Sequence, residues 1–175
     1  MKKIKIEDYI ASVPDFPKKG ILFRDVTSAL EDGEVFNYMI EEFAEYAKKV
    51  KANVIAGPEA RGFIFGSALA YKLNLGFVPF RKPNKLPRET ISVTYDLEYG
   101  TDTLSVHKDS LKKGDKVLIV DDLLATGGTA LAAAELVEKL GAEVAGFAFV
   151  INLKNLPGEE KIKKYDKFFL VEYEE

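Results

Sequence analysis

Residues 117–130 read Val117-Leu118-Ile119-Val120-Asp121-Asp122-Leu123-Leu124-Ala125-Thr126-Gly127-Gly128-Thr129-Ala130. Four consecutive aliphatic residues open this stretch, as is typical of a strand buried on both faces in a parallel sheet, and two carboxylates follow directly. A loop of small residues, Ala125 to Thr129, leads into an alanine-rich segment, 130–140, that we expect to be helical. Several backbone N–H groups could meet one anion at the start of that helix. The stretch therefore predicts a phosphate site beside a pair of carboxylates.

The two carboxylates must contact another part of the ligand, because they repel phosphate. Ribose hydroxyls and a bound Mg²⁺ are the natural candidates, so a sugar phosphate would suit the whole stretch. Two other interpretations stay open. Gly127-Gly128 could be an ordinary turn between strand and helix, and Asp121-Asp122 could be the Mg²⁺-binding acids of a signalling receiver or a nucleotide hydrolase. No Gly-Lys-Ser or Gly-Lys-Thr occurs, which excludes a Walker loop.

The composition narrows the class of protein. The 175 residues, 47% of them hydrophobic, suffice for one well-buried domain but are few for two. The absence of Cys and the single His exclude disulfides, thiolate catalysis and Cys- or His-rich metal sites within the chain. A net charge of -3 gives no general attraction to nucleic acid or anionic membranes. The start of the chain lacks the apolar run of a signal peptide, so a cytoplasmic protein is expected.

The remaining segments alternate between strand-like and helix-like patterns. We expect helices at 6–13, 34–50 and up to Leu73, the second of them capped by Asp32 or Gly33. Strands are expected at 53–58, 76–81, 143–153 and 168–171, and 90–95 and 103–107 should form a hairpin or flap. The pattern predicts one domain, 1–175, built on a doubly wound, mostly parallel α/β sheet. It would carry an N-terminal hood (about 1–33) and a basic loop with the flap (about 81–107).

Two loops at strand ends carry cations. Arg61 lies where a strand stops and a helix starts, which suits it to a diphosphate, although it could instead only pair with Glu59. The proline-rich segment 81–88 is a basic loop whose charge suits a polyphosphate; for Lys82 and Arg88 a solvated turn is the alternative. His107 has no nearby nucleophile in sequence and is interpreted as structural or peripheral.

Three motifs resemble those of the type I phosphoribosyltransferases. The run from Val117 to Thr129 resembles their motif for phosphoribosyl pyrophosphate (PRPP). Phe16-Pro17-Lys18-Lys19-Gly20-Ile21-Leu22-Phe23-Arg24-Asp25 and Tyr95-Asp96-Leu97-Glu98-Tyr99-Gly100 resemble segments of the family members that act on adenine. The resemblance extends over nearly the whole chain and implies the type I phosphoribosyltransferase fold.

The resemblance implies a purine salvage enzyme that transfers the 5-phosphoribosyl group from PRPP to adenine, giving AMP and pyrophosphate. It also implies a homodimer, and Mg²⁺ held through PRPP or pyrophosphate and water without metal ligands from the protein. A transferase for a 6-oxopurine or orotate is one alternative, but the Lys that usually meets the oxo group cannot be identified. A non-catalytic PRPP-sensing regulator is another. The chain leaves no room for an added winged-helix domain, and its acidity argues against a nucleic-acid partner.

The resemblance assigns roles to site residues. Asp121 and Asp122 would hold the ribose hydroxyls and stabilise positive charge at the anomeric carbon. Arg61, near an expected non-proline cis peptide bond, would offset negative charge on the leaving pyrophosphate, and Glu98 would manage the proton or charge of the purine. The implied substrate contacts are Leu22, Phe23 and Arg24 for adenine; Glu59, Ala60, Arg81 (reaching the neighbouring subunit) and Lys85 for pyrophosphate; Tyr99 for excluding water; and Leu123, Ala125, Thr126, Gly127, Gly128 and Thr129 for the ribose 5-phosphate.

Overall fold

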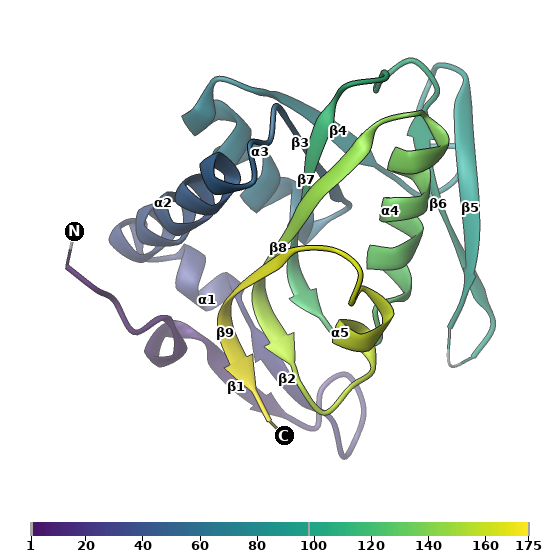
Figure 1. Ribbon diagram of the computed structural model, residues 1–175. Coiled ribbons are helices and arrows are strands. Elements are labelled where there is room, and N and C mark those ends of the chain that lie inside the picture. The colour runs from purple at the N-terminus through teal and green to yellow at the C-terminus, as the bar shows by residue number, and fades with distance from the viewer. Residues whose placement is uncertain (1, 98, 175) are drawn as a thin grey trace.

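The structure of the protein is a computed structural model that describes residues 2–97 and 99–174 (Figure 1). Its elements, in chain order, are η1 (Ile6–Tyr9), β1 (Ala11–Pro14), β2 (Leu22–Asp25), α1 (Thr27–Leu30), α2 (Gly33–Lys49), β3 (Val54–Pro58), α3 (Arg61–Leu73), β4 (Gly76–Phe80), β5 (Thr90–Asp96), β6 (Thr101–His107), β7 (Lys116–Leu124), α4 (Gly128–Lys139), β8 (Glu143–Leu153), α5 (Gly158–Lys161) and β9 (Lys167–Tyr173).

The centre of the fold is a five-stranded parallel sheet with the strand order β4-β3-β7-β8-β9. Counted along the chain within this sheet, the order is 2-1-3-4-5, a doubly wound arrangement. The order reverses between β3 and β7, and in such sheets ligands bind outside the carboxyl ends of the strands at that point. The predicted fold class is therefore confirmed, and the segment 117–130 lies where a ligand is expected.

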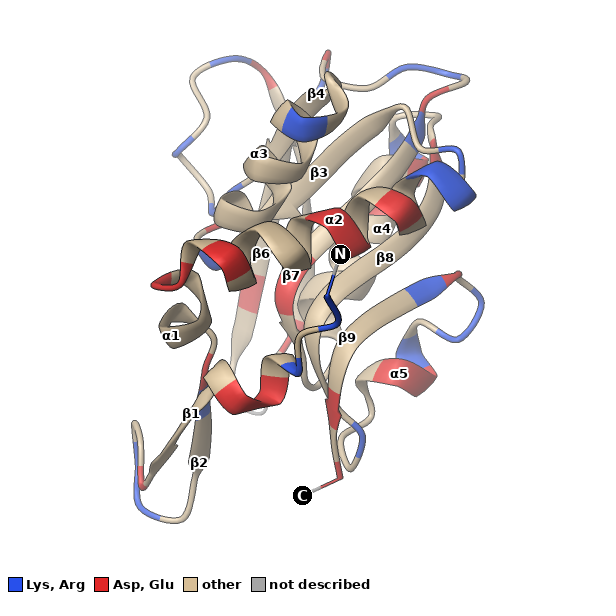
Figure 2. Cartoon of the chain, turned by 90° about the vertical axis from the view of Figure 1, so that its left-hand side faces the viewer, with Lys and Arg blue, Asp and Glu red and all other residues tan. Residues whose placement is uncertain are grey.

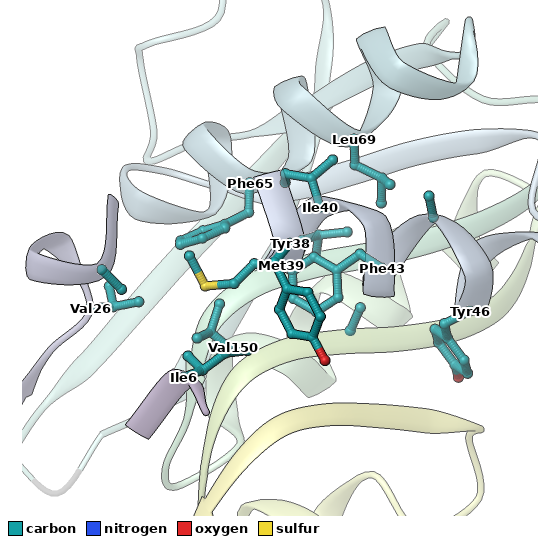
Figure 3. Close-up of a cluster of buried hydrophobic side chains, with 14 of the residues drawn as sticks. Ile6, Val26, Tyr38, Met39, Ile40, Phe43, Tyr46, Phe65, Leu69 and Val150 are labelled. Atoms are coloured by element: carbon teal, nitrogen blue, oxygen red, sulfur yellow. The ribbon is translucent and has the colours of Figure 1, made fainter. Parts of the chain in front are cut away.

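Both faces of the sheet are covered, as the run of aliphatic residues in β7 predicts. Leu118 and Val120 join a buried cluster with α2 and α3, whereas Val117 and Ile119 join a second cluster with α4. Figure 3 shows part of the first cluster, in which Met39 and Phe43 of α2 and Phe65 of α3 lie over the sheet. These layers fix the position of the loops that follow β3 and β7.

Two antiparallel hairpins extend from the sheet. The strands β1 and β2 pair with each other, and so do β5 and β6. In Figure 1 the hood hairpin β1–β2, the tip of the hairpin β5–β6 and the carboxyl ends of β7, β8 and β9 all lie at the lower end of the molecule. An isolated bridge between Arg81 and Ser105 ties the basic loop to β6. The hood, the flap and the basic loop thus surround one end of the sheet.

One of the expected elements needs correction. The predicted helix 6–13 is wrong beyond Tyr9, because Ala11–Pro14 pairs with Leu22–Asp25 as β1 and only η1 is helical. The acids lie within the carboxyl-terminal part of β7, which runs to Leu124, since Asp121, Leu123 and Leu124 continue the pairing with β8. The expected cap of α2 is confirmed: the Asp32 carboxylate accepts hydrogen bonds from the N–H groups of Glu34 and Val35.

The surface carries both charges side by side. Figure 2 shows blue basic and red acidic segments interspersed along the helices and loops of the side that it presents. Of the helices within residues 2–97 and 99–174, none has the length and apolar character needed to cross a bilayer.

Candidate active site

A cavity of about 330 Å³ opens at the carboxyl ends of β3 and β7. Its walls come from the loop after β3, the basic loop, the hairpin β5–β6 and the whole segment from Asp121 to Ala130. The predicted site residues that line it are Glu59, Ala60, Arg61, Asp121, Asp122, Leu123, Ala125, Thr126, Gly127, Gly128 and Thr129. The acids and the glycine loop therefore share one cavity, as predicted from the sequence.

The loop from Ala125 to Thr129 is held in shape by α5. Gly127 has a φ of +82°, and a Cβ atom placed there would lie 2.8 Å from the Cα atom of Gly158. The N–H of Gly158 donates to the carbonyl of Ala125 at 3.0 Å. The helix α4 begins at Gly128, and the first N–H groups of a helix have no intrahelical acceptor, which suits this loop to an anion.

The two adjacent acids are in different environments. Asp122 is 6% exposed, and its carboxylate accepts a hydrogen bond from Nε of Arg61. Asp121 accepts the N–H of Asp122 at 2.8 Å. Burial, followed by the negative charge of Asp122, raises the pKa of Asp121 well above its ordinary value. The pair thus retains a proton more readily than two isolated carboxylates would, until a cation or hydroxyl donor approaches.

Arg61 is tied to the acids and not to Glu59, which was its alternative partner. Burial alone would lower the pKa of Arg61, but the hydrogen bond to Asp122 and the charges of Asp122, Asp121 and Asp25 raise it. Of these acids, Asp25 ends the hood strand β2. The expected non-proline cis bond is present next to Arg61, between Glu59 and Ala60.

Glu59 instead joins the loop after β3 to the basic loop. Its carboxylate accepts a hydrogen bond from Nε of Arg81 at 3.1 Å and from the N–H of Lys82 at 2.8 Å. The Arg81 guanidinium also reaches the carbonyl of Lys85 at 3.5 Å. Arg81 and Lys85 do not line the cavity within the described chain, although both lie on the loop that borders it.

Three polar residues of the cavity were not assigned from the sequence: Lys82, Tyr95 and Asp102. The Lys82 ammonium contacts the Asp102 carboxylate, and the Tyr95 hydroxyl lies 3.4 Å from that carboxylate and 3.1 Å from the Thr129 hydroxyl. The sequence could have identified Asp102 as a paired acid. Side chains alternate between the two faces of a strand, so in β6 Asp102 shares a face with Leu104 and Val106, which are buried. An acid on an apolar face usually has a partner.

The adenine contacts proposed for the hood do not line this cavity. Leu22 is 43% exposed, and the Phe23 ring contacts the edge of Phe16 with 5.1 Å between ring centres. The Arg24 guanidinium lies 4.0 Å from the centre of the Tyr173 ring and also contacts Ser12. The structure therefore places these residues beside the site without joining them to it.

The tip of the flap is only partly described. Leu97 lines the cavity, and Tyr99 is 84% exposed. Glu98, the predicted catalytic residue of the flap, lies outside the described residues. His107 is buried away from the cavity, where its Nε2 accepts the N–H of Arg88 at 3.3 Å, in agreement with a structural role.

The fold and the cavity together define a doubly wound α/β protein with a polar cavity at the switch point of its sheet. The sequence pattern of the phosphoribosyl transferase domain matches residues 29–174. An adenine phosphoribosyltransferase from Clostridium botulinum strain Hall is 57% identical to the chain, covering 97% of this chain and 99% of that protein. The chain belongs to the phosphoribosyltransferase family, among the adenine phosphoribosyltransferases.

Solved structures agree with this assignment. The adenine phosphoribosyltransferase of Thermoanaerobacter pseudethanolicus is 53% identical and superimposes with a TM-score of 0.93 over 97% of this chain and 98% of that one. The Saccharomyces cerevisiae enzyme is 39% identical, with a TM-score of 0.91 over 95% of this chain and 97% of that one. It was crystallised with D-2,5-dideoxy-2,5-imino-altritol 1,6-bisphosphate and adenine.

Proposed function

We propose that the protein transfers the 5-phosphoribosyl group from PRPP to adenine and releases AMP and pyrophosphate, a reaction of purine salvage. The observation that carries this proposal is the single cavity lined by both the Asp121–Asp122 pair and the loop 125–129. A phosphorylated ribose has the two kinds of group that this cavity needs, hydroxyls at one end and a phosphate at the other. The yeast relative, bound to adenine and a bisphosphorylated iminosugar, supports the same pairing of ligands.

In this proposal the loop from Ala125 to Thr129 binds the 5′-phosphate, with N–H groups at the start of α4 as donors. Asp121 and Asp122 accept hydrogen bonds from the ribose hydroxyls and stabilise positive charge as the bond to pyrophosphate breaks. Arg61 already lies against Asp122, so it can hold that carboxylate in place and face the leaving pyrophosphate at once. The N9 atom of adenine then attacks the anomeric carbon from the opposite side.

Magnesium fits this site as part of the substrate. No group of three or more His, Cys, Asp or Glu side chains that could hold a metal occurs among the described residues. Oxygen atoms of the diphosphate and the ribose, with water, would complete the coordination that Mg²⁺ prefers. Bound in this way, the ion would neutralise part of the diphosphate charge.

The base would enter between the hood and the cavity. The backbone of Leu22 and Arg24 would offer hydrogen bonds to the edge of adenine, and Phe23 would lie against its face. Fixed backbone donors and acceptors can discriminate an amino group from an oxo group, because the wrong base leaves a buried polar group unpaired. Leu22 is 43% exposed, which leaves apolar surface for a base to cover.

A coupled assay of AMP formation tests the proposal. Adenine should support synthesis from PRPP in the presence of Mg²⁺, and hypoxanthine, guanine, xanthine and orotate should not. Replacing Asp121 by Asn should lower kcat/KM by about 10²-fold or more, the usual effect of removing a group that stabilises developing charge. Replacing Thr129 by Ala should lower kcat/KM through weaker binding of the 5′-phosphate. Equal rates with a 6-oxopurine would identify the alternative transferase, and binding to RNA without AMP synthesis would identify a regulator.

We also propose that the enzyme acts as a homodimer. On α3, Ile64 and Tyr71 are 39% and 91% exposed. They are seven residues apart, so they lie on the same side of the helix. Aromatic residues are enriched in protein interfaces, so this side of α3 is the candidate contact surface.

A further inference from the structure

Three cations in or beside the cavity, Arg61, Arg81 and Lys82, have carboxylate partners among the described residues. The ion pairs are Arg61 with Asp122, Arg81 with Glu59, and Lys82 with Asp102. The three acids come from β7, from the loop after β3 and from β6, so the pairing is not a local feature of one segment. An anion that contacts one of these three cations must compete with its carboxylate partner.

Both the backbone N–H and the side-chain ammonium of Lys82 have carboxylate partners. Its N–H donates to Glu59 at 2.8 Å, which fixes the backbone at the start of the basic loop. Its ammonium contacts the Asp102 carboxylate, which also accepts the N–H of Thr103 at 2.8 Å. Both Lys82 and Asp102 line the cavity next to the loop that begins α4. The ammonium therefore already has a carboxylate partner inside the cavity.

Lys82 and Asp102 both stay ionised at neutral pH. Burial would raise the pKa of Asp102, but the hydrogen bonds from Lys82, Thr103 and Tyr95 and the charge of Lys82 together outweigh it, and the pKa lies below its ordinary value. Burial would lower the pKa of Lys82, but its interactions with Asp102 and Tyr95 together outweigh it, so that pKa is raised. The side chains of Lys82 and Asp102 are 39% and 28% exposed, so water can reach the pair and a ligand can open it.

Resting on the function proposed above, we propose that Asp102 is a specificity-determining residue that occupies the Lys82 ammonium and so discriminates against small inorganic anions. Sulfate or phosphate gains one cation and leaves the Asp102 carboxylate unpaired beside a new negative charge. A sugar diphosphate brings more charge and contacts several groups at once, so it can replace the carboxylate and remain bound. The pair thereby favours the substrate over simple anions, which offer a small part of its contacts.

The experiment measures the dissociation constants of sulfate and inorganic phosphate by competition and calorimetry on the full chain. Asp102→Asn should bind both anions about two- to five-fold more tightly than the wild type, the range that a half-exposed ion pair allows. In a Lys82→Met background the same Asp102→Asn change should have no effect, because the gain depends on the freed ammonium.

Asp109→Asn is the matched control. It removes the same charge from an exposed ion pair with Arg88, whose two side chains are 58% and 68% exposed. An equal gain in this control would mean that net charge alone is responsible and would overturn the proposal. The proposal also fails if sulfate affinity stays unchanged or falls in folded Asp102→Asn, or if neither protein binds the anions. A failure of the proposed reaction itself would be seen separately, as absent AMP synthesis by the wild type.

Discussion

Two constraints require glycine at position 127, a positive φ and a close approach to Gly158. The φ of +82° at Gly127 costs other residues about 1–2 kcal/mol, and a Cβ atom there would lie 2.8 Å from the Cα atom of Gly158. Gly127→Ala should therefore lower the free energy of unfolding by about 2 kcal/mol or more and weaken PRPP binding, because the loop must move away from α5. Urea unfolding and PRPP titration measure the two effects.

Gly141→Ala separates the two constraints. Gly141 has nearly the same φ, +83°, but a Cβ atom there would meet nothing within 4 Å. This variant should lose only the conformational part, about 1 kcal/mol, and should bind PRPP as the wild type does. If both variants lose the same stability and the same affinity, the contact with Gly158 does not shape the loop.

The raised pKa of Asp121 predicts how stability depends on pH. Its pKa is higher in the folded protein than in the unfolded chain, so the stabilising effect of its proton is complete below the unfolded pKa and disappears as the pH rises through the folded pKa. Asp121→Asn cannot ionise and should become more stable relative to the wild type as the pH increases from about 4. Urea unfolding of both proteins at several pH values measures the difference.

Asp102→Asn should behave in the opposite way. The pKa of Asp102 is lowered in the fold, so its contribution is present above the unfolded pKa and is lost at lower pH. That variant should therefore lose stability relative to the wild type as the pH rises through about 4. Parallel curves for the two variants would contradict the assignment of opposite shifts.

Single residues were predicted from the sequence where the chemistry is local. Asp121, Asp122 and Gly127 follow one another in the order that a strand, an acidic end and a phosphate loop require. Their partners could not be predicted in the same way. Arg61 meets Asp122 across 61 positions and Lys82 meets Asp102 across 20, and only the folded sheet and hairpin bring these pairs together.

At the scale of elements, the error lies where pairing between distant strands overrides a local pattern. The apolar spacing of residues 6–13 suits a helix, but Ala11–Pro14 finds a partner in Leu22–Asp25 and forms a strand. The acids at 121 and 122 lie near the carboxyl end of β7, as the sequence indicates, and pairing with β8 extends the strand as far as Leu124. The hairpin β5–β6 was predicted correctly because its signal, alternation around a turn, is local.

The hairpin β5–β6 also provides a test of the flap. Leu97 at its tip lines the cavity. Glu98 lies outside the described residues, and its role toward the base stays a prediction from the family resemblance. Glu98→Leu should reduce kcat by about 10²-fold or more, the usual contribution of a general acid or base, with little change in PRPP affinity. Steady-state kinetics and equilibrium PRPP binding measure both, and Glu98→Gln tells whether charge or hydrogen bonding matters.

Equal losses in kcat and in PRPP affinity would instead assign Glu98 a binding role. Tyr95→Phe is a useful comparison on the same hairpin, since it removes the hydroxyl that lies 3.1 Å from the Thr129 hydroxyl. It should affect the 5′-phosphate end of the substrate and therefore mainly PRPP affinity.

At the scale of the molecule, the sheet gathers loops from distant parts of the sequence at one end. The cavity is bounded by segments near positions 59, 82, 102 and 125, and the hood lies beside them (Figure 1). The strand order places β3 and β7 next to each other, which is why the cations and the acids meet. The apolar side of α3, with Ile64 and Tyr71, is left on the outside of this arrangement.

The proposed homodimer can be tested at Tyr71 on α3. Tyr71→Arg places a charge at a side chain that is 91% exposed in one chain, so the fold of the monomer should be unaffected. If this surface is covered in the dimer, the buried charge should shift the protein to monomers at micromolar concentration, because an unpaired charge in an interface is costly to desolvate. Light scattering after size exclusion measures the mass directly.

Leu131→Arg on α4 is the matched control, since that side chain is 40% exposed on the other face of the sheet and should leave the oligomeric state unchanged. The position of Tyr71 on α3 links assembly to chemistry, because Arg61 begins the same helix. Loss of the dimer should therefore also lower AMP synthesis at low enzyme concentration, and higher concentration should restore part of it. A Tyr71→Arg protein that keeps the mass of the wild type would show that α3 is not the contact surface.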